Sequence, residues 1–486
     1  MKRVERLRGM HDLSQEAWLR QRDLQDRLQD LIGGHGYRLL EMPILEPTEL
    51  FLRKSGGTLA SQIYSFTDAG SNPVSLRPEF TSPIMRYYLE HATEVDLPAR
   101  WQYAGPVFRY EVAHPEGSGQ FTQLGAELIG SASVLADVEL LTLAAQVPGH
   151  LGLSGCRVEL ADLDVVHGIL DAVGVSDRAR GYIIGSIPSL RPGPPVLPAV
   201  LERARQLHLM GQDLDEQELS AAVVGLDDDQ ARQVLQGFLQ WRGGEAQRLG
   251  QRTPEQVVDR LLRKLRGNAD EGRLEHGLEL IAELVSASGD NARVLRVARQ
   301  VVNRAGAATS ALDQLEETLD LVSRGPASGA AYVLDFGLAR DLAYYNGIVF
   351  EVKHPGWAGN LGGGGRYDGL ARALGGESTV PASGFAYTLE ALLALGESQG
   401  VWRNGVAQPG GTLVLPLGAG SQLAALRVAQ ELRASGQLAE LPVELPIELD
   451  VAGRDLAAGL AYAAHRGLNR VVGVDAAGRQ SVHEVK

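Results

Sequence analysis

The sequence predicts an α+β protein in which helices flank an antiparallel sheet, a mostly helical segment interrupts that sheet, and a small α/β domain follows. Residues 101–111 and 121–130 alternate apolar and polar side chains on either side of a polar loop with glycine and proline, which is typical of two antiparallel strands. Residues 136–325 are rich in Leu, Ala, Arg, Gln and Glu, with capping residues before several runs, as in helices. From Thr412 onwards, strand-like and helix-like runs alternate, which indicates an α/β unit.

The chain begins with an amphipathic helix. From Leu13 to about Leu31 apolar residues recur at helical spacing, and a glycine cluster that begins at Gly33 ends the run, because glycine loses more backbone freedom in a helix than any other residue. Residues 37–47 alternate and end in prolines. Since proline cannot donate a ladder hydrogen bond, we expect an edge or interface strand there.

Strand patterns return after the helical segment, at residues 331–336 and 348–352, and we expect a helix to begin near Gly384. The proline-rich residues 189–198 predict an exposed, extended connection within the helical segment. We expect three domains: a sheet domain of residues 1–135 with 330–402, a helical insertion of residues 136–329, and a small α/β domain of residues 411–486.

The composition is that of an acidic protein with ample material for packed cores. Of the 486 residues 44% are hydrophobic, and 46 basic against 60 acidic side chains give a formal net charge of −14, which argues against a polyanionic partner. A single cysteine, Cys156, excludes an intramolecular disulfide. The N-terminus has no apolar segment of the secretory kind and no apolar run approaches the about 20 residues that cross a bilayer, so we expect a cytoplasmic protein.

Seven landmarks occur in order along the chain. They are Arg8-Gly-Met-His-Asp-Leu13, Leu76-Arg-Pro-Glu-Phe-Thr81, Phe108-Arg-Tyr-Glu111, Gln123 with Glu127, Arg340 to Glu351, Gly363-Gly-Gly-Arg-Tyr-Asp-Gly-Leu370, and Pro381-Ala-Ser-Gly-Phe-Ala386. With them the sequence resembles the class II synthetase domain of the histidyl-tRNA synthetases over residues 8–130 and 330–395. The tail is similar, more weakly, to that family's anticodon-binding domain. The resemblance implies a class II synthetase-like antiparallel sheet flanked by helices.

The resemblance also implies a pocket for free histidine. Such a pocket needs anions for the ammonium and imidazole groups, a polar group for the carboxylate and an aromatic wall. By similarity Glu79 and Thr81 bind the α-amino group, Gln123 contacts the backbone end, and Glu127 with Tyr345 faces the imidazole. The expected histidine-binding set is Glu79, Thr81, Arg109, Gln123, Glu127, Arg340, Tyr344 and Tyr345. Two other interpretations stay open: a solvent-facing Glu127, and the two tyrosines as core aromatics.

The same comparison implies that synthetase chemistry is lost. Adenylate formation needs several fixed cations, since ATP carries about four negative charges. Arg109 is retained, but Gly117, in the loop at residues 112–119, stands where the family has a γ-phosphate arginine, and Ala391 stands where it has an ATP-clamping arginine. Arg340, similar to the family's histidine-side arginine, is followed by an aspartate in place of glycine, which indicates structural pairing.

Neither a metal nor a cofactor is expected. The glycine-rich run at residues 362–369 lacks the Lys-Ser/Thr of a phosphate loop, and we interpret it as a tight turn that lines the amino-acid pocket. His114, His354 and His483 lie far apart in the sequence, without the spacing of metal ligands.

Within the histidyl-synthetase-like group, the chain is most similar to the regulatory subunits of ATP phosphoribosyltransferase, which are catalytically silent paralogues; residues 81–86 and 120–130 favour that branch. The similarity implies a dimer formed through the Pro43 region and a hetero-oligomer with the short-form catalytic subunit of the first step in histidine biosynthesis. The chain would activate that subunit and transmit inhibition by histidine, with no role for a membrane or tRNA.

Two alternatives stay open. A histidyl-tRNA synthetase is favoured by the tail, since the regulatory branch generally lacks an anticodon-type domain. From Thr412 onwards, however, the tail has six arginines and one lysine against eight carboxylates, so it carries no basic excess for an RNA backbone. The third possibility is a free-standing histidine-binding protein, or a paralogue that acts on another substrate.

Overall fold

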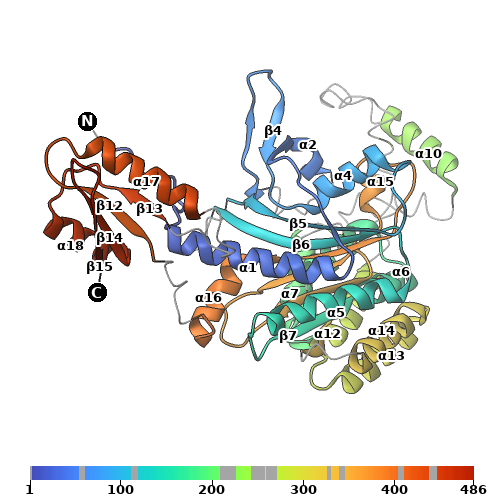
Figure 1. Cartoon of the computed structure of the whole chain (residues 1–486). Helices are drawn as coiled ribbons and strands as arrows, with labels where there is room; N and C mark the ends of the chain where they lie inside the picture. The colour runs from blue at the N-terminus through green and yellow to red at the C-terminus, as the bar shows by residue number, and fades with distance from the viewer. Residues whose placement is uncertain are drawn as a thin grey trace. The chain divides into compact units, whose positions relative to one another are not determined.

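The computed structural model describes residues 3–53, 61–110, 119–207, 209, 226–241, 258, 271–325, 330–338, 345–402, 410–436 and 446–485. The chain divides into two compact units, Met1–Ser14 with Gln21–Val401 and Gln15–Arg20 with Trp402–Lys486. The larger unit holds two sheets and most of the helices, and the smaller unit holds a third sheet (Figure 1).

The main sheet of the larger unit has eight strands. Their spatial order is β1 (Arg38–Leu39), β5 (Ala99–Phe108), β6 (Gln120–Ile129), β11 (Ala382–Thr388), β10 (Gly362–Arg366), β9 (Ile348–Lys353), β7 (Arg157–Asp162) and β8 (Ala331–Leu334). Every pairing from β5 to β7 is antiparallel, whereas β1 and β8 pair in parallel at the two edges. The predicted α+β fold with a central antiparallel sheet is confirmed, and so are the neighbouring strands β5 and β6.

Two central strands differ from what the sequence predicts. The residues from Gly384, expected to begin a helix, lie in β11, and the helix α16 (Leu389–Gln399) begins where that strand ends. The glycine run, expected as a tight turn, forms β10. Both strands are largely buried on both faces, which removes the alternation that marks a strand. Glycine suits β10, because a Cβ at Gly362 would lie 2.7 Å from the Tyr387 ring.

Different helices cover the two faces of the main sheet (Figure 1). On one face lie α1 (Gln15–Gly34), which ends in the glycine cluster as expected, and α5 (Val134–His150). The Gln102 side chain of β5 donates a hydrogen bond to the Gln29 carbonyl of α1, 3.2 Å away, which fixes α1 to this face. On the opposite face lie α4 (Thr81–His91) and α15 (Leu370–Ala373).

The segment at residues 136–329, predicted as a helical insertion, is mostly helical but also contributes one strand to the main sheet. Its strand β7 pairs with β9 and β8, and α5 packs against β11. The other described elements of the segment are α6 (Leu163–Val173), α7 (Asp177–Leu190), the 3₁₀ turn η1 (Pro194–Val196), α8 (Leu197–Gln206), α10 (Asp228–Trp241), α12 (Glu271–Ser286), α13 (Asn291–Ala305) and α14 (Ser310–Arg324). The prediction of an extended connection at residues 189–198 is wrong, because η1 and the start of α8 occupy much of this stretch. Their prolines lie in the first turn, where a missing N–H is tolerated.

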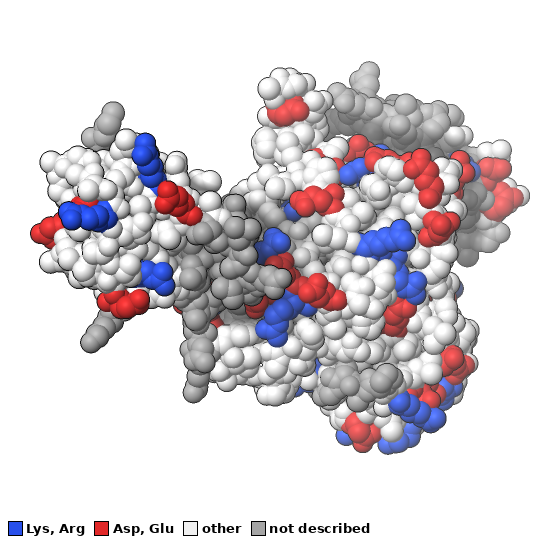
Figure 2. Space-filling model, viewed as in Figure 1, with Lys and Arg blue, Asp and Glu red and all other residues white. Residues whose placement is uncertain are grey.

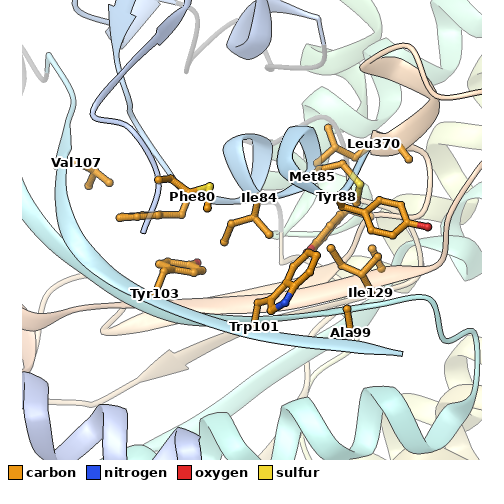
Figure 3. Packing of buried hydrophobic residues seen from close by; sticks show 14 residues of the cluster. Phe80, Ile84, Met85, Tyr88, Ala99, Trp101, Tyr103, Val107, Ile129 and Leu370 are labelled. Carbon is orange, nitrogen blue, oxygen red and sulfur yellow. The ribbon is translucent and has the colours of Figure 1, made fainter. Parts of the chain in front are cut away.

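A buried cluster holds the start of α4 over β5. Phe80, Ile84 and Met85, at or just after the helix start, are at most 1% exposed. They face Trp101 and Tyr103 of β5 (Figure 3). The rings of Phe80 and Tyr103 stack with their centroids 4.4 Å apart, an arrangement that contributes about 0.5–1.5 kcal/mol beyond burial alone.

A buried arginine joins the second sheet of this unit to the core. That sheet consists of β2 (Leu45–Pro47), β4 (Pro73–Leu76) and β3 (Ser65–Thr67), and α2 (Thr48–Leu52) follows β2. Arg77, directly after β4, is 1% exposed and donates hydrogen bonds to the carbonyls of Met42, Pro43 and Pro106. Its guanidinium carbon lies 4.0 Å from the centroid of the Phe80 ring. Burial lowers the pKa of Arg77 to about 10, so the side chain stays charged at neutral pH.

The smaller unit is α/β, as the sequence predicts. Its sheet has the order β13 (Ile447–Leu449), β12 (Thr412–Pro416), β14 (Arg470–Val474) and β15 (Gln480–Glu484). The strand β12 runs parallel to β13 and β14, and β15 is antiparallel. The helices α17 (Gln422–Gly436) and α18 (Leu456–Arg466) bury apolar side chains against this sheet. Across both units, no helix of the described ranges is long and apolar enough to cross a bilayer.

We expect Arg77→Met to lower the free energy of unfolding of the larger unit by about 2–4 kcal/mol, because buried carbonyls lose their charged donor. Arg53→Met is the matched control, since Arg53 pairs with Glu49 at the surface and such pairs contribute about 0.5 kcal/mol. Urea unfolding followed by circular dichroism measures both. Equal losses in the two variants would contradict the role given to Arg77.

Candidate functional site

The centre of the sheet face below α4 is lined by glycines. The register aligns Glu127 of β6 with Gly384 of β11, and Gly384 with Gly365 of β10. Directly paired residues of an antiparallel ladder point to the same face, so Gly125 and Gly363 continue this floor. A Cβ at Gly384 would lie 1.5 Å from Oε2 of Glu127. The position of the carboxylate therefore requires glycine at residue 384.

Glu127 is the centre of the site. It is 1% exposed, so its carboxylate is removed from bulk water. Oε1 accepts a hydrogen bond of 2.7 Å from the Thr81 hydroxyl and one of 3.3 Å from the Tyr103 hydroxyl, and Oε2 accepts one from the Tyr367 hydroxyl. The structure therefore excludes a solvent-facing Glu127, one of the two interpretations that the sequence leaves open.

Electrostatics at Glu127 oppose its ionisation. Burial raises the pKa of this carboxyl from 4.5 to about 8, and the nearby charge of Glu79 adds to the rise. The hydrogen bonds from Tyr367, Thr81 and Tyr103 act in the opposite direction. Because desolvation outweighs these bonds, the surroundings of Glu127 favour the neutral form of its carboxyl more than water does.

Glu79 lies at the start of α4. Both of its carboxylate oxygens accept from the Ser82 backbone N–H, at 3.2 and 3.1 Å, which satisfies an otherwise unpaired amide of the first helical turn. Burial raises the pKa of Glu79, whereas the charge of Arg109 lowers it. The sequence pairs Glu79 with Thr81 at a ligand's amino group. In the structure, the Thr81 hydroxyl is hydrogen-bonded to Glu127, and Glu79 to the Ser82 amide of its own helix.

Arg109 follows β5 and lies at the same end of the site. Its Nε donates a 2.9 Å hydrogen bond to the Pro78 carbonyl, and its guanidinium carbon lies 5.2 Å from the centroid of the Phe121 ring. Its backbone N–H donates to the Gly119 carbonyl. The arginine is therefore anchored next to Glu79.

Gln123 is two ladder positions from Glu127 on the same face of β6. It is 8% exposed, and its Oε1 has no hydrogen-bond partner within the described part of the chain. A buried acceptor without a partner costs about 1–3 kcal/mol. An N–H group of a ligand on the glycine floor would satisfy it, and the role of Gln123 in a pocket stays a prediction.

Two tyrosines form a wall beside the floor. The ring centroids of Tyr345 and Tyr367 are 6.5 Å apart, edge to face. Arg366, next to Tyr367, pairs with Asp368, and the Asp368 N–H donates to the side chain of Asn346, next to Tyr345. These bonds join the two segments that carry the ring pair. Arg340 and Tyr344, the other residues of the predicted pocket, lie outside the described residues.

Sequence reasoning misses two of the hydroxyls that bind Glu127. Tyr103 reads as one apolar position of an alternating strand, and Tyr367 belongs to a glycine-rich motif interpreted as a turn. The sequence contains a signal for each tyrosine. Tyr103 is two residues after Trp101, so both side chains point to the same face of β5, and Tyr367 lies within one of the seven landmarks. Neither signal reveals that Tyr367 is hydrogen-bonded to Glu127, which lies 240 positions away in the sequence.

The side chains gathered around Glu127 have a chemistry that suits a small nitrogen-bearing molecule. Two buried carboxylates, the Tyr103, Tyr345 and Tyr367 rings, and a glycine floor together suit N–H groups and cationic or aromatic parts of a molecule. Among the residues that the structure describes, no three His, Cys, Asp or Glu side chains gather as metal ligands would.

Comparison with known proteins agrees with this fold, which is that of a class II synthetase-like protein. The family model described as Histidyl-tRNA synthetase matches residues 9–187 and 202–392, more than half of the chain. The chain therefore belongs to the histidyl-tRNA synthetase family.

Relatives of two kinds resemble the chain along nearly its whole length. A histidine–tRNA ligase of Methanocaldococcus jannaschii is 27% identical over 467 residues, which cover 96% of this chain and 90% of the relative. An ATP phosphoribosyltransferase regulatory subunit of Symbiobacterium thermophilum is 28% identical over 465 residues, which cover 96% and 95%. A crystal structure named as an ATP phosphoribosyltransferase regulatory subunit/histidyl-tRNA synthetase from Bacillus halodurans C has a TM-score of 0.62 at 21% identity, covering 98% of this chain and 100% of that one, and shows the common fold.

Gly384→Ala should destabilise the protein by about 1–3 kcal/mol, because the added methyl displaces the Glu127 carboxylate. In a Glu127→Ala background the same change should cost less, since the carboxylate is gone and only the Ala126 carbonyl, 2.7 Å from the added Cβ, still obstructs it. Urea midpoints of the four proteins in this double-mutant cycle give the coupling. Gly185→Ala, in an open position of α7, is the control and should be neutral or slightly stabilising. Additive effects at residues 384 and 127 would refute the contact.

Glu127→Gln should remove a pH dependence of stability. Because the folded pKa is raised, the native state holds a proton that the unfolded state loses, so wild-type stability falls as pH rises from about 4.5 to about 8. The variant cannot ionise there, and its advantage should grow across that window by roughly 2–5 kcal/mol. Unfolding free energies at several pH values measure the slope. Parallel curves for the two proteins would disprove the shift.

Proposed function

We propose that the chain is a non-catalytic regulatory subunit that binds histidine and controls the short-form ATP phosphoribosyltransferase of the first step in histidine biosynthesis. The observation that carries this proposal is a contrast within one site. The groups around Glu127 are present and packed, whereas α16 presents Ala391 where the synthetases carry an ATP-clamping arginine.

The start of α16 is built without a cation. Ala391 is a buried methyl, 7% exposed. The preceding Glu390 accepts the Thr122 backbone N–H at 2.9 and 3.0 Å and the Gln21 side-chain amide at 3.4 Å. These contacts fix the helix to β6 and α1 but offer no positive charge to a triphosphate. Adenylate chemistry depends on such charges, so this end of the site supports binding of an amino acid rather than its activation.

Over its described residues, the smaller unit offers few unpaired cations to an RNA backbone. Most of its arginines have protein partners: Arg433 donates to the Ile447 carbonyl, and Arg454, Arg466, Arg470 and Arg479 pair with Asp450, Glu448, Glu484 and Asp475. On the face shown in Figure 2, basic and acidic side chains are interspersed among the coloured atoms. Phosphate binding draws its affinity from counterions released around unneutralised cations, so this surface favours a protein partner over tRNA.

Histidyl-tRNA synthetase is the second candidate. Relatives with that name, such as the Methanocaldococcus ligase, align along 96% of the chain and so include the tail. The relative named as a regulatory subunit aligns equally well, at 28% identity. Ala391 in α16 and the paired arginines of the smaller unit support the regulatory candidate.

The proposed assembly is a cytoplasmic homodimer that joins catalytic subunits in a hetero-oligomer. Residues 1–135 and 330–402 would form the histidine-binding domain, with a helical domain at 136–329 and a partner-binding domain at 411–486. Feedback is then a linkage in which histidine binds the inhibited arrangement more tightly than the active one, with a coupling of about 1–3 kcal/mol.

Initial rates of the short-form ATP phosphoribosyltransferase from the same genome, with and without this chain and across a histidine titration, test the proposal. We expect a rate gain and its loss with histidine. Glu127→Ala should raise the half-inhibitory histidine concentration more than about tenfold, since a buried charge-assisted contact is worth over 1.4 kcal/mol. Glu94→Ala, at an exposed carboxylate, is the matched control.

A companion assay measures histidine-dependent ATP–pyrophosphate exchange by the chain alone. Clear turnover would overturn the regulatory function and establish the synthetase. An unchanged transferase rate, with a folded chain in micromolar excess, would equally reject the proposal.

A further inference from the structure

We propose that a single water molecule is bound beneath the glycine floor, in a cavity between α5 and the main sheet, where it joins Ser383 of β11 to Asp137 of α5. The inference does not depend on the proposed function, because it concerns the face of the sheet opposite to Glu127.

The cavity lies directly behind the floor. Gly365 and Gly384 border it, so their backbone separates the Glu127 carboxylate on one face from the cavity on the other. The cavity leaves about 10 Å³ for the centre of a water molecule. A single buried water needs roughly 10–15 Å³ measured in this way. The cavity is therefore of a size for one water.

Ser383 supplies the first polar group of the cavity. It is the direct ladder partner of Arg366, so the two side chains point to the same face of the sheet. On that face Nη2 of Arg366 lies 2.7 Å from Oδ1 of Asp137, so the Ser383 side chain also points towards α5. Ser383 is 2% exposed, and its Oγ has no hydrogen-bond partner within the described ranges. Because an unpaired buried hydroxyl is costly, this position calls for a further polar partner in the cavity.

Asp137 and Arg366 supply the other polar groups. Both line the cavity, and the bond between them uses only one oxygen of the Asp137 carboxylate. A carboxylate has about four lone-pair sites, so Asp137 can accept from a second donor. A water at this place donates to Asp137 and exchanges hydrogen bonds with Ser383 and Arg366. These three partners lie within the two to four that are typical of a buried water.

The charges of the cavity favour a neutral occupant. Asp137 and Arg366 already pair with each other, and their side chains are 13% and 9% exposed. An added cation would be repelled by the guanidinium and an added anion by the carboxylate, whereas a water suits both groups. The remaining side chains of the lining are apolar and offer no hydrogen bond: Leu140, Leu141, Ile348 and Phe350. The water is therefore held at the polar end of the cavity.

The bound water connects two layers of the protein next to the tyrosine wall. Arg366 is followed directly by Tyr367, whose hydroxyl donates to Glu127. Arg366 also donates to the Ser131 carbonyl, beyond the end of β6. With the water in place, β11 joins this set of bonds through Ser383, and the floor is fixed from behind to α5.

A crystal structure of the full chain, at a resolution that shows ordered waters, tests the proposal directly. We expect one water at hydrogen-bonding distance from Ser383, Asp137 and Arg366. A cavity without electron density would overturn the proposal, and so would a water that makes no contact with Ser383.

The sign of the effect of Ser383→Ala gives an independent test in solution. With the water bound, the change removes a paired hydroxyl and should lower the ratio of folded to unfolded protein about two- to tenfold, as the loss of one hydrogen bond does. In a dry cavity it removes an unpaired hydroxyl, so the ratio should stay unchanged or rise. Either of the latter results in urea unfolding would refute the water site.

Ser75→Ala is the matched control. Ser75 is fully buried in β4 of the same unit, and its Oγ lies 2.8 Å from the Thr48 hydroxyl. Because this serine has a protein partner, its loss should lower the ratio of folded to unfolded protein whether or not a water is bound at Ser383. The control shows that the assay detects the loss of one buried serine hydroxyl.

Discussion

The whole site depends on a single desolvated carboxylate in the middle of a sheet. Placing Glu127 there costs several kcal/mol, and the structure offsets the cost with hydroxyls from three separate segments. Each of those segments needs its own support. The stacking of Phe80 on Tyr103 holds α4 and β5 together, and the bonds of Arg366, Asp368 and Asn346 hold the tyrosine wall. The core is thus arranged around a polar contact.

Whether the sequence pattern predicts an element depends on how that element is buried in the fold. The helix α1 and the strands β5 and β6 each show a clear period in the sequence, so pattern alone predicts them. The strands β10 and β11 are largely buried on both faces, and β10 is rich in glycine, so β10 imitates a turn and β11 a helix start. The seven landmarks place Glu127 in a pocket, but the hydroxyls of Tyr103 and Tyr367 reach it through tertiary contacts that no local pattern encodes.

Under the proposed function, ligand recognition and the lost reaction would belong to different parts of this scaffold. The carboxylates, rings and glycine floor that would hold an amino acid lie on the central strands, where packing fixes them. The charge needed for a triphosphate belongs in the family to positions such as residue 391, where a methyl group can replace an arginine without disturbing Glu390 or its bonds to β6. A fold arranged in this way can lose its chemistry and keep a sensor, because the two depend on separable residues.

The four successive glycines of β10 have one more consequence. Glycine gains the most freedom when a strand opens, at about 0.5–1 kcal/mol per residue relative to alanine, so local opening of β10 costs less than it would for a strand with side chains. A ligand resting on it would quench these fluctuations without shifting any helix. The molecule could then signal occupancy to a partner through a change in stiffness, with both states almost identical in shape.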